Sequence, residues 1–226
     1  MTDKKQKKIT LVSPKATFRY PKLNAPDFGT EQYKKEGGEY SVQLVMDAEA
    51  ARPFIEKLTP LHEAAVQEGQ VKFDNLNVAQ RKKLGTLKVQ PLFMEEYDKE
   101  TEEPTGNLIF KFASKASGVG KDGKSWSRKP TVFDAKGQAI TKLPDIWGGT
   151  VGKVSFTPNP YFIAGQGLAG LKLYLSAVQI IELRSGGGTA DSFGFGEEEG
   201  FEYEETSTPA EKEGFGAAED DGEEDF

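Results

Sequence analysis

The sequence contains no cysteine and only one histidine among its 226 residues. Without cysteine, disulfide bonds and thiolate metal sites are excluded. The histidine, His62, falls on the flank of a predicted helix beside Leu61 and Ala65, a position typical of a structural side chain. No Walker-type phosphate loop and no HExxH motif is present. We therefore expect a protein that is not an enzyme and that has no metal site and no cofactor.

Long hydrophobic runs are also missing. The longest uncharged stretch, Val154–Leu171, contains two prolines and three glycines, whereas a membrane helix needs about 20 mostly apolar residues. The first ten residues carry four lysines and no apolar run, so they do not form a secretory signal. We expect a cytoplasmic chain that does not enter a membrane.

Charge is divided unevenly along the chain. The formal net charge is −7, but residues 189–226 hold 15 acidic residues and one lysine. Residues 1–188 then hold 28 Lys and Arg against 21 Asp and Glu, a net charge of +7. Such asymmetry indicates a basic body that meets an anionic partner and an acidic tail that acts separately.

Short alternating segments predict a mainly β fold. Ala16–Leu23 and Glu39–Met46 read as strands, and in the second Tyr40, Val42, Leu44 and Met46 alternate with polar residues. Further strands are expected at Leu87–Tyr97, Asn107–Lys115, around Thr131–Phe133 and at Val151–Thr157. Pro158-Asn159-Pro160 is expected to interrupt the last of these. The final strand is expected to point six side chains inward: Leu171, Leu173, Leu175, Ala177, Ile181 and Leu183. About seven short strands favour an OB-like Greek-key barrel.

A helical insertion separates two of these strands. Asp47 is expected to cap a helix that carries Phe54, Leu58 and Ala65 on one face. Thr59-Pro60 resembles a new N-cap, so two short helices or a kink are expected there. A second helical piece is expected over Asn77–Leu84.

These elements predict three regions: a basic N-terminal arm over residues 1–14, an OB-like binding domain over residues 15–185, and a glycine hinge with an acidic tail over residues 186–226. The tail combines Glu, Asp and Gly with isolated aromatic rings and cannot bury enough apolar surface to order itself.

Sequence-tolerant binding of single-stranded nucleic acid needs cations along the phosphates and aromatic faces for the bases. Three segments supply both, and we select from them the following DNA-binding residues: Arg19 and Tyr20; Lys115, Lys121, Lys124, Trp126, Arg128 and Lys129; Lys153, Tyr161, Phe162, Lys172 and Tyr174. Packing of Trp126 or Tyr174 against the body is the alternative at each place. Alternation favours core positions for Phe18 and Phe156.

The tail shares two attributes with single-stranded DNA, dense negative charge and detachable rings. A body that attracts DNA should therefore attract this tail at an effective concentration near millimolar, in the same chain or in a second copy. Its last residues offer a partner protein a ring and a free carboxylate: Asp220, Asp221, Glu223, Glu224, Asp225 and Phe226.

The chain resembles the bacteriophage single-stranded DNA-binding proteins that have an OB fold and an acidic tail ending in phenylalanine. The resemblance is carried by Ala25-Pro-Asp-Phe-Gly29, Gly148-Gly149 through Pro160-Tyr161, Lys172-Leu-Tyr-Leu175, the triple glycine at 186–188 and Asp225-Phe226. It implies coating of single strands during replication and recombination in the cytoplasm of an infected bacterial host. It also implies tail contacts with replication enzymes such as DNA polymerase or helicase-primase, and a binding ring at Tyr161. Where a second ring is expected, this chain has Ile163, with Phe162 adjacent.

Two readings from other classes remain open. In one, an acidic-tailed interaction or chaperone-like protein never touches DNA. In the other, a phage structural protein assembles without it. Exchange of tails between two bodies would give a homodimer, which the sequence leaves open.

Overall fold

The computed structural model describes residues 9–185. The chain divides into two units between Gly187 and Gly188, and the described residues belong to the first. The predictions for residues 1–8, for the glycine hinge and for the acidic tail lie outside them. Neither helix of residues 9–185 is long and apolar enough to cross a membrane.

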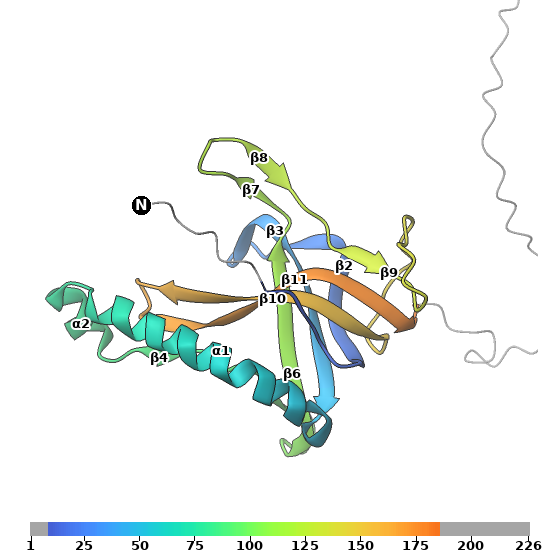
Figure 1. The fold of residues 1–226 in the computed structure, drawn as a ribbon, viewed down its shortest axis with the longest axis horizontal. Coiled ribbons are helices and arrows are strands. Elements are labelled where there is room, and N and C mark those ends of the chain that lie inside the picture. Colours follow the sequence, from blue (N-terminus) through green and yellow to red (C-terminus); the bar gives the residue numbers. More distant parts are fainter. Residues whose placement is uncertain (1–8, 186–226) are drawn as a thin grey trace, which may run out of the picture. The chain divides into compact units, whose positions relative to one another are not determined.

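Strands make up about half of the described chain (Figure 1). The elements are β1 (Leu11–Val12), β2 (Ala16–Gly29), β3 (Lys34–Asp47), α1 (Ala48–Asp74), α2 (Val78–Leu84), β4 (Lys88–Val89), β5 (Met94–Tyr97), β6 (Pro104–Lys115), β7 (Ser117–Val119), β8 (Ser125–Ser127), β9 (Thr131–Phe133), β10 (Val151–Ile163) and β11 (Leu168–Glu182).

Five of these strands close on themselves. The order β10-β2-β3-β6-β11 is hydrogen-bonded from neighbour to neighbour, and β11 pairs with β10 again. All pairs in this ring are antiparallel except β6 with β11, which is parallel. The predicted OB-like Greek-key barrel is confirmed. Alternation in β3 is as predicted, because Tyr40, Val42, Leu44 and Met46 are all buried.

The helical insertion lies between β3 and β6, and α1 runs along one side of the barrel while the β7–β8 hairpin projects from another (Figure 1). Asp47 caps α1, since its carboxylate accepts hydrogen bonds from the backbone N–H groups of Glu49 and Ala50. Phe54 enters the barrel core with its ring 5.1 Å from Phe110 and 5.8 Å from Phe156. The helix is therefore part of the core.

The expected break at Thr59-Pro60 is wrong as a division into two helices, because α1 is continuous through Pro60. Buried Leu58 and Ala65 lie on either side of the proline. Their packing on the barrel offsets the backbone hydrogen bond that a proline removes from a helix.

The prolines at 158 and 160 do not end the strand that contains them. β10 continues to Ile163 and pairs with β11 at both prolines. Its other edge pairs with β2 only at Val151 and Gly152 and with β1 only at Ser155 and Phe156. Beyond Phe156 β10 is thus an edge strand within the described chain, where a missing N–H costs little.

The predicted inward face of β11 is correct only for its first half. Leu171, Leu173 and Leu175 are buried, but Val178 and Ile180 then replace Ala177 and Ile181 as the buried residues. Phe156 pairs with Leu175 while Ser155 pairs with Ala177, so Ser176 is an extra residue. This β-bulge reverses the alternation.

The segment expected as one strand at Leu87–Tyr97 is two short strands. β4 runs parallel to β11 and β5 runs antiparallel to β6. The residues between them, Gln90–Phe93, leave the sheet and form one wall of the site described below.

Gly69 of helix α1 packs against Ala169 of β11. A Cβ added to Gly69 would lie 2.3 Å from the Cβ of Ala169. We expect Gly69→Ala to lower the free energy of unfolding by about 1–2 kcal/mol, because overpacking outweighs the better helix propensity of alanine. Urea denaturation measures the change.

The double variant Gly69→Ala/Ala169→Gly should recover most of this loss. Gly165→Ala is the control, since a Cβ there meets nothing within 4 Å. Equal stability of Gly69→Ala and the unaltered chain would contradict the close contact.

Candidate nucleic-acid interface

The outward side chains of adjacent barrel strands form a continuous face. Register places Arg19 of β2 opposite Gln43 of β3, and Gln43 opposite Lys111 of β6. On the next strands Tyr174 of β11 lies opposite Ala113 of β6 and Thr157 of β10. Because side chains alternate along a strand, these positions share the face that points away from the core.

A cluster of two rings and one cation lies where the β7–β8 hairpin meets this face. The Arg128 guanidinium donates to the Tyr174 hydroxyl at 3.1 Å. Its Cζ atom lies 5.7 Å from the ring centre of Trp126 and 6.0 Å from that of Tyr174. The Trp126 indole lies across Gly118, where an added Cβ would be 2.8 Å from the ring. Trp126, Arg128 and Tyr174, selected from separate segments, are therefore neighbours.

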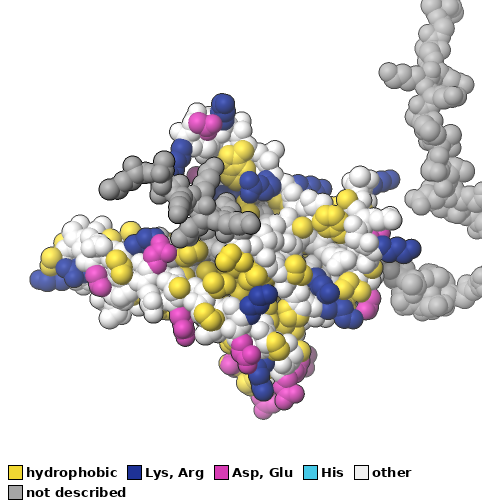
Figure 2. Space-filling view, in the orientation of Figure 1, with side chains coloured by type: hydrophobic (Ala, Val, Ile, Leu, Met, Phe, Trp, Pro, Cys, Tyr) yellow, Lys and Arg dark blue, Asp and Glu magenta, His cyan; other side chains and the backbone are white. Residues whose placement is uncertain are grey.

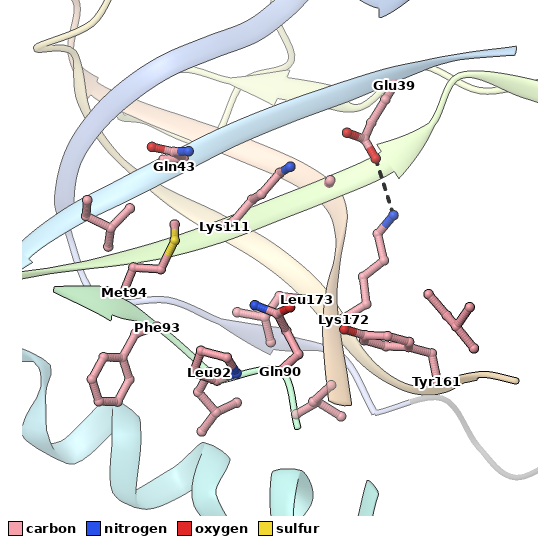
Figure 3. Close-up of a pocket in the computed structure, with 15 residues that line it drawn as sticks. Glu39, Gln43, Gln90, Leu92, Phe93, Met94, Lys111, Tyr161, Lys172 and Leu173 are labelled. Carbon is pink, nitrogen blue, oxygen red and sulfur yellow. Dashed lines mark hydrogen bonds and ion pairs between the residues drawn. The ribbon is translucent and has the colours of Figure 1, made fainter. Parts of the chain in front are cut away.

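A groove of about 590 Å³ opens between the insertion and the barrel (Figure 3). Tyr161 and Lys172 line it, together with Lys111 and two glutamines, Gln43 and Gln90. Its remaining lining is mostly apolar: Pro91, Leu92, Phe93, Met94, Ile109, Ala113, Ile163, Leu171 and Leu173. Burial raises the pKa of the Tyr161 hydroxyl above its ordinary value.

A carboxylate already neutralises part of the positive charge in this groove. Glu39 lies 3.4 Å from the Lys172 ammonium, the contact dashed in Figure 3, and 3.3 Å from that of Lys35. Lys35 also donates to Asp27 at 2.6 Å, and this hydrogen bond raises the pKa of the Lys35 ammonium. Within residues 9–185, Lys111 in the groove has no such carboxylate partner, and neither has Lys115, which lines a separate hollow with Lys34 and Lys35.

Arg19 and Tyr20 both lie on the solvent side of β2, although strict alternation would separate them. Tyr20 has φ +48°, at a register shift between Arg19 and Lys22. This irregularity exposes Tyr20, while Phe18 stays in the core as predicted. Arg19 stacks 5.0 Å from the Tyr20 ring centre and is paired with Glu96 at 2.8 Å. A hydrogen bond from the Arg19 side chain to Tyr20 lowers the pKa of the Tyr20 hydroxyl.

The other selected residues lie apart from the groove and the ring cluster. Lys121 and Lys124 are exposed in the turn of the β7–β8 hairpin, and Lys129 is exposed just after it. Lys153 lines a separate hollow of about 230 Å³ beside Val12 and Phe133. Phe162 is half-buried opposite Ala169. The tail residues 220–226 lie outside the described chain.

Positive charge is not confined to a single patch on the face that Figure 2 shows. On the face seen in Figure 2, lysines and arginines are spread over several elements, including the α2 end, whose last turn holds Arg81, Lys82 and Lys83. Acidic side chains gather at the lower end, where Asp98 to Glu103 connect β5 to β6. Specific contacts, more than overall charge, therefore distinguish the candidate interface.

Several side chains that line the groove are not among the binding residues selected from the sequence. Gln43 and Lys111 follow from alternation in β3 and β6 and could have been selected. Gln90 and Met94 belong to the insertion, and only the fold brings them to Tyr161. No group of three or more His, Asp or Glu that could hold a metal occurs among residues 9–185.

A small OB-like barrel that exposes rings and cations on its outer strands is typical of nucleic-acid-binding modules. The family model for the single-stranded DNA-binding protein of bacteriophage T7 matches residues 15–183. The single-stranded DNA-binding protein of Enterobacteria phage T3 is 30% identical over 182 residues, which cover 77% of this chain and 76% of that protein. The chain therefore belongs to the bacteriophage T7 single-stranded DNA-binding protein family.

Two further comparisons agree with this assignment. The single-stranded DNA-binding protein of Escherichia phage T7 is 27% identical over 179 residues, covering 77% of this chain and 75% of that protein. The crystal structure of the single-stranded DNA-binding protein encoded by bacteriophage T7 shares the fold, with a TM-score of 0.61, 24% identity, and coverage of 88% of this chain and 100% of that chain.

Arg128 is expected to hold the β7–β8 hairpin against the barrel. In Arg128→Ala, Trp126 loses the guanidinium and Tyr174 loses a hydrogen-bond donor. We expect the tryptophan emission to shift to longer wavelength and acrylamide to quench it more strongly. The free energy of unfolding should change by less than about 1 kcal/mol, because these contacts are exposed.

The measurement uses a Trp147→Phe background, which leaves Trp126 as the only tryptophan. Lys129→Ala is the control, because it removes a neighbouring cation that makes no ion pair within residues 9–185. An unchanged emission spectrum in Arg128→Ala would contradict the role given to Arg128.

Proposed function

We propose that the chain binds single-stranded DNA without catalysis and with little sequence preference. The observation that carries this proposal is the arrangement of Trp126, Arg128 and Tyr174 beside a groove that holds Tyr161 and Lys172, on the outer face of the barrel. Each base stacked on an aromatic ring contributes about 1–3 kcal/mol whatever its identity. Family membership supports the same ligand.

The proposed binding residues differ in their contributions. Tyr161, Trp126 and Tyr174 supply rings, and Lys111 is added to the cations Lys115, Lys172 and Arg128. Lys121, Lys124 and Lys129 would contact phosphates that pass the hairpin. Arg19 is already paired with Glu96, Lys153 lies in the separate hollow, and Phe162 is half-buried, so we assign these three a smaller share.

The proposed division of labour is a basic arm over residues 1–14, a binding domain over residues 15–185 and a hinge with tail over residues 186–226. The tail competes with DNA for the domain and recruits replication enzymes such as DNA polymerase or helicase-primase. The protein serves replication and recombination of phage DNA in the cytoplasm of the infected host.

Deleting residues 189–226 tests the competition. A tail that binds its own domain with a Kd of about 0.1 mM would, at an effective concentration of about 1 mM, weaken DNA binding about tenfold. We expect the truncated chain to bind an unstructured oligonucleotide about tenfold more tightly. Fluorescence anisotropy across a salt series measures it, with a slope of roughly −0.7 per neutralised phosphate.

Truncated and full chains that bind equally would refute the competition by the tail. Absence of binding by both chains would instead favour an acidic-tailed interaction or chaperone-like protein. This second candidate is favoured by the ion pairs of Lys172 with Glu39 and of Arg19 with Glu96, because these cations already have negative partners.

Glu39 should limit the affinity for DNA. A phosphate that approaches Lys172 must replace this carboxylate, which is also within 3.3 Å of Lys35. In Glu39→Gln, Lys172 loses its carboxylate partner, whereas Lys35 keeps Asp27. We expect two- to fivefold tighter binding, roughly the effect of one exposed ion pair. The salt dependence should become steeper, since more counterions are released.

Glu63 is an exposed carboxylate on α1 outside the groove. Glu63→Gln is therefore the matched control, because it makes the same change in net charge. Weaker binding by Glu39→Gln than by the control would mean that Glu39 positions Lys172 for DNA.

A further inference from the structure

The groove between the insertion and the barrel is built before any ligand enters. Its outer wall is fixed by backbone contacts, because Gln90 N–H donates to the Ala169 carbonyl at 2.8 Å and His62 Nε2 lies 2.8 Å from the Gln90 carbonyl. Its volume of about 590 Å³ is within the range of about 300–1,000 Å³ typical of small-molecule sites.

Gly170 determines how Tyr161 lies in this groove. A Cβ at Gly170 would come within 2.8 Å of the Gln90 Cβ and 3.1 Å of the Tyr161 hydroxyl oxygen. The glycine therefore lets the Tyr161 ring lie close to β11, with its hydroxyl beside Gln90. Figure 3 shows both side chains at the same end of the groove.

The lining is suited to a flat ligand with apolar faces and a polar edge. Leu171 and Leu173 are buried side chains of the barrel core that line the groove, and Leu92 and Phe93 pack partly against that core. Gln43 and Gln90 add two side-chain amides that make no hydrogen bond within residues 9–185. Lys111 and Lys172 lie along the barrel side.

An amide carries both a donor and an acceptor and can rotate to exchange them. Two such groups can meet the edge of a purine or a pyrimidine, so the groove needs no particular base. A base must leave its stack and its partner strand to enter, whereas a duplex keeps its Watson–Crick edges paired and its base faces stacked. These properties match a site that selects single strands without reading their sequence.

We propose that this groove receives one unstacked nucleobase of the bound strand. Tyr161 contacts the base, Gln43 and Gln90 hydrogen-bond its edge, and Lys111 and Lys172 hold the adjoining phosphates. This site is additional to the ring cluster at Trp126, Arg128 and Tyr174, and it rests on the proposed binding of single-stranded DNA. It gives the helical insertion a direct part in the interface.

The test uses the full chain and the double variant Gln43→Ala/Gln90→Ala. The Gln90 contacts to Ala169 and His62 are made by its backbone, so the variant keeps them. The probes are an oligothymidylate and an abasic oligonucleotide of the same length and charge. We expect the variant to bind oligothymidylate about tenfold more weakly, the effect of two lost hydrogen bonds, and to bind the abasic probe unchanged.

The salt slope should stay the same, because no cation is removed. Gln67→Ala/Gln80→Ala removes two exposed amides outside the groove and is the matched control. An equal loss on both probes, or no loss on either, would overturn the base site. If the unaltered chain binds neither probe, the proposed function itself fails.

Photocrosslinking with 5-iododeoxyuridine in the oligonucleotide gives a second measurement that does not depend on a variant. Crosslinks mapped by mass spectrometry to Tyr161 or to residues 90–94 would support the base site. Crosslinks confined to residues 117–128 would overturn it.

Discussion

The insertion of Phe54 from α1 into the barrel is the contact on which the candidate site depends. Its ring meets Phe110 and Phe156 edge-on, and Phe156 in turn meets Phe112 at 5.1 Å. Because α1 is fixed to the core in this way, the chain that follows it returns along β11 at a defined position. A core contact between rings thus anchors the helix from which the chain continues to one wall of the groove.

The insertion also contacts strand β11 and one wall of the groove directly. The close approach of Gly69 to Ala169 brings α1 against β11, and β4 pairs with the same strand at Leu168 and Ala169. His62, the only histidine, then links α1 to the groove wall at Gln90. His62 thus makes a structural contact, the role expected of it from the sequence.

Much of the barrel could be predicted from the sequence, because a half-buried strand imposes a period of two. This period placed the buried side chains of β3 correctly, and from it followed the outward positions of Lys172 and Tyr174. The capping residue Asp47 was also recognisable, since only a few residue types accept backbone hydrogen bonds at a helix start.

The predictions failed where tertiary pairing overrides local pattern. The bulge at Ser176 reverses the inward face of β11. Pro158 interrupts a strand only if both edges of that strand are paired, which depends on partners far away in the sequence. The groove was beyond reach for the same reason, because Gln90 and Tyr161 become neighbours only through Gly170.

The ion pairs on the outer face limit how electrostatics can act in binding. When a phosphate replaces Glu39 at Lys172, one anion is exchanged for another, so the net Coulomb gain is small compared with that at an unpaired cation such as Lys111. The glutamate is only 17% exposed, so a phosphate that takes over Lys172 leaves a largely buried carboxylate without that cation, at a cost in free energy. Affinity must therefore come in larger part from stacking and from hydrogen bonds to base edges. A face of this kind would discriminate by the availability of unpaired bases more than by charge, which is the property that separates a single strand from a duplex.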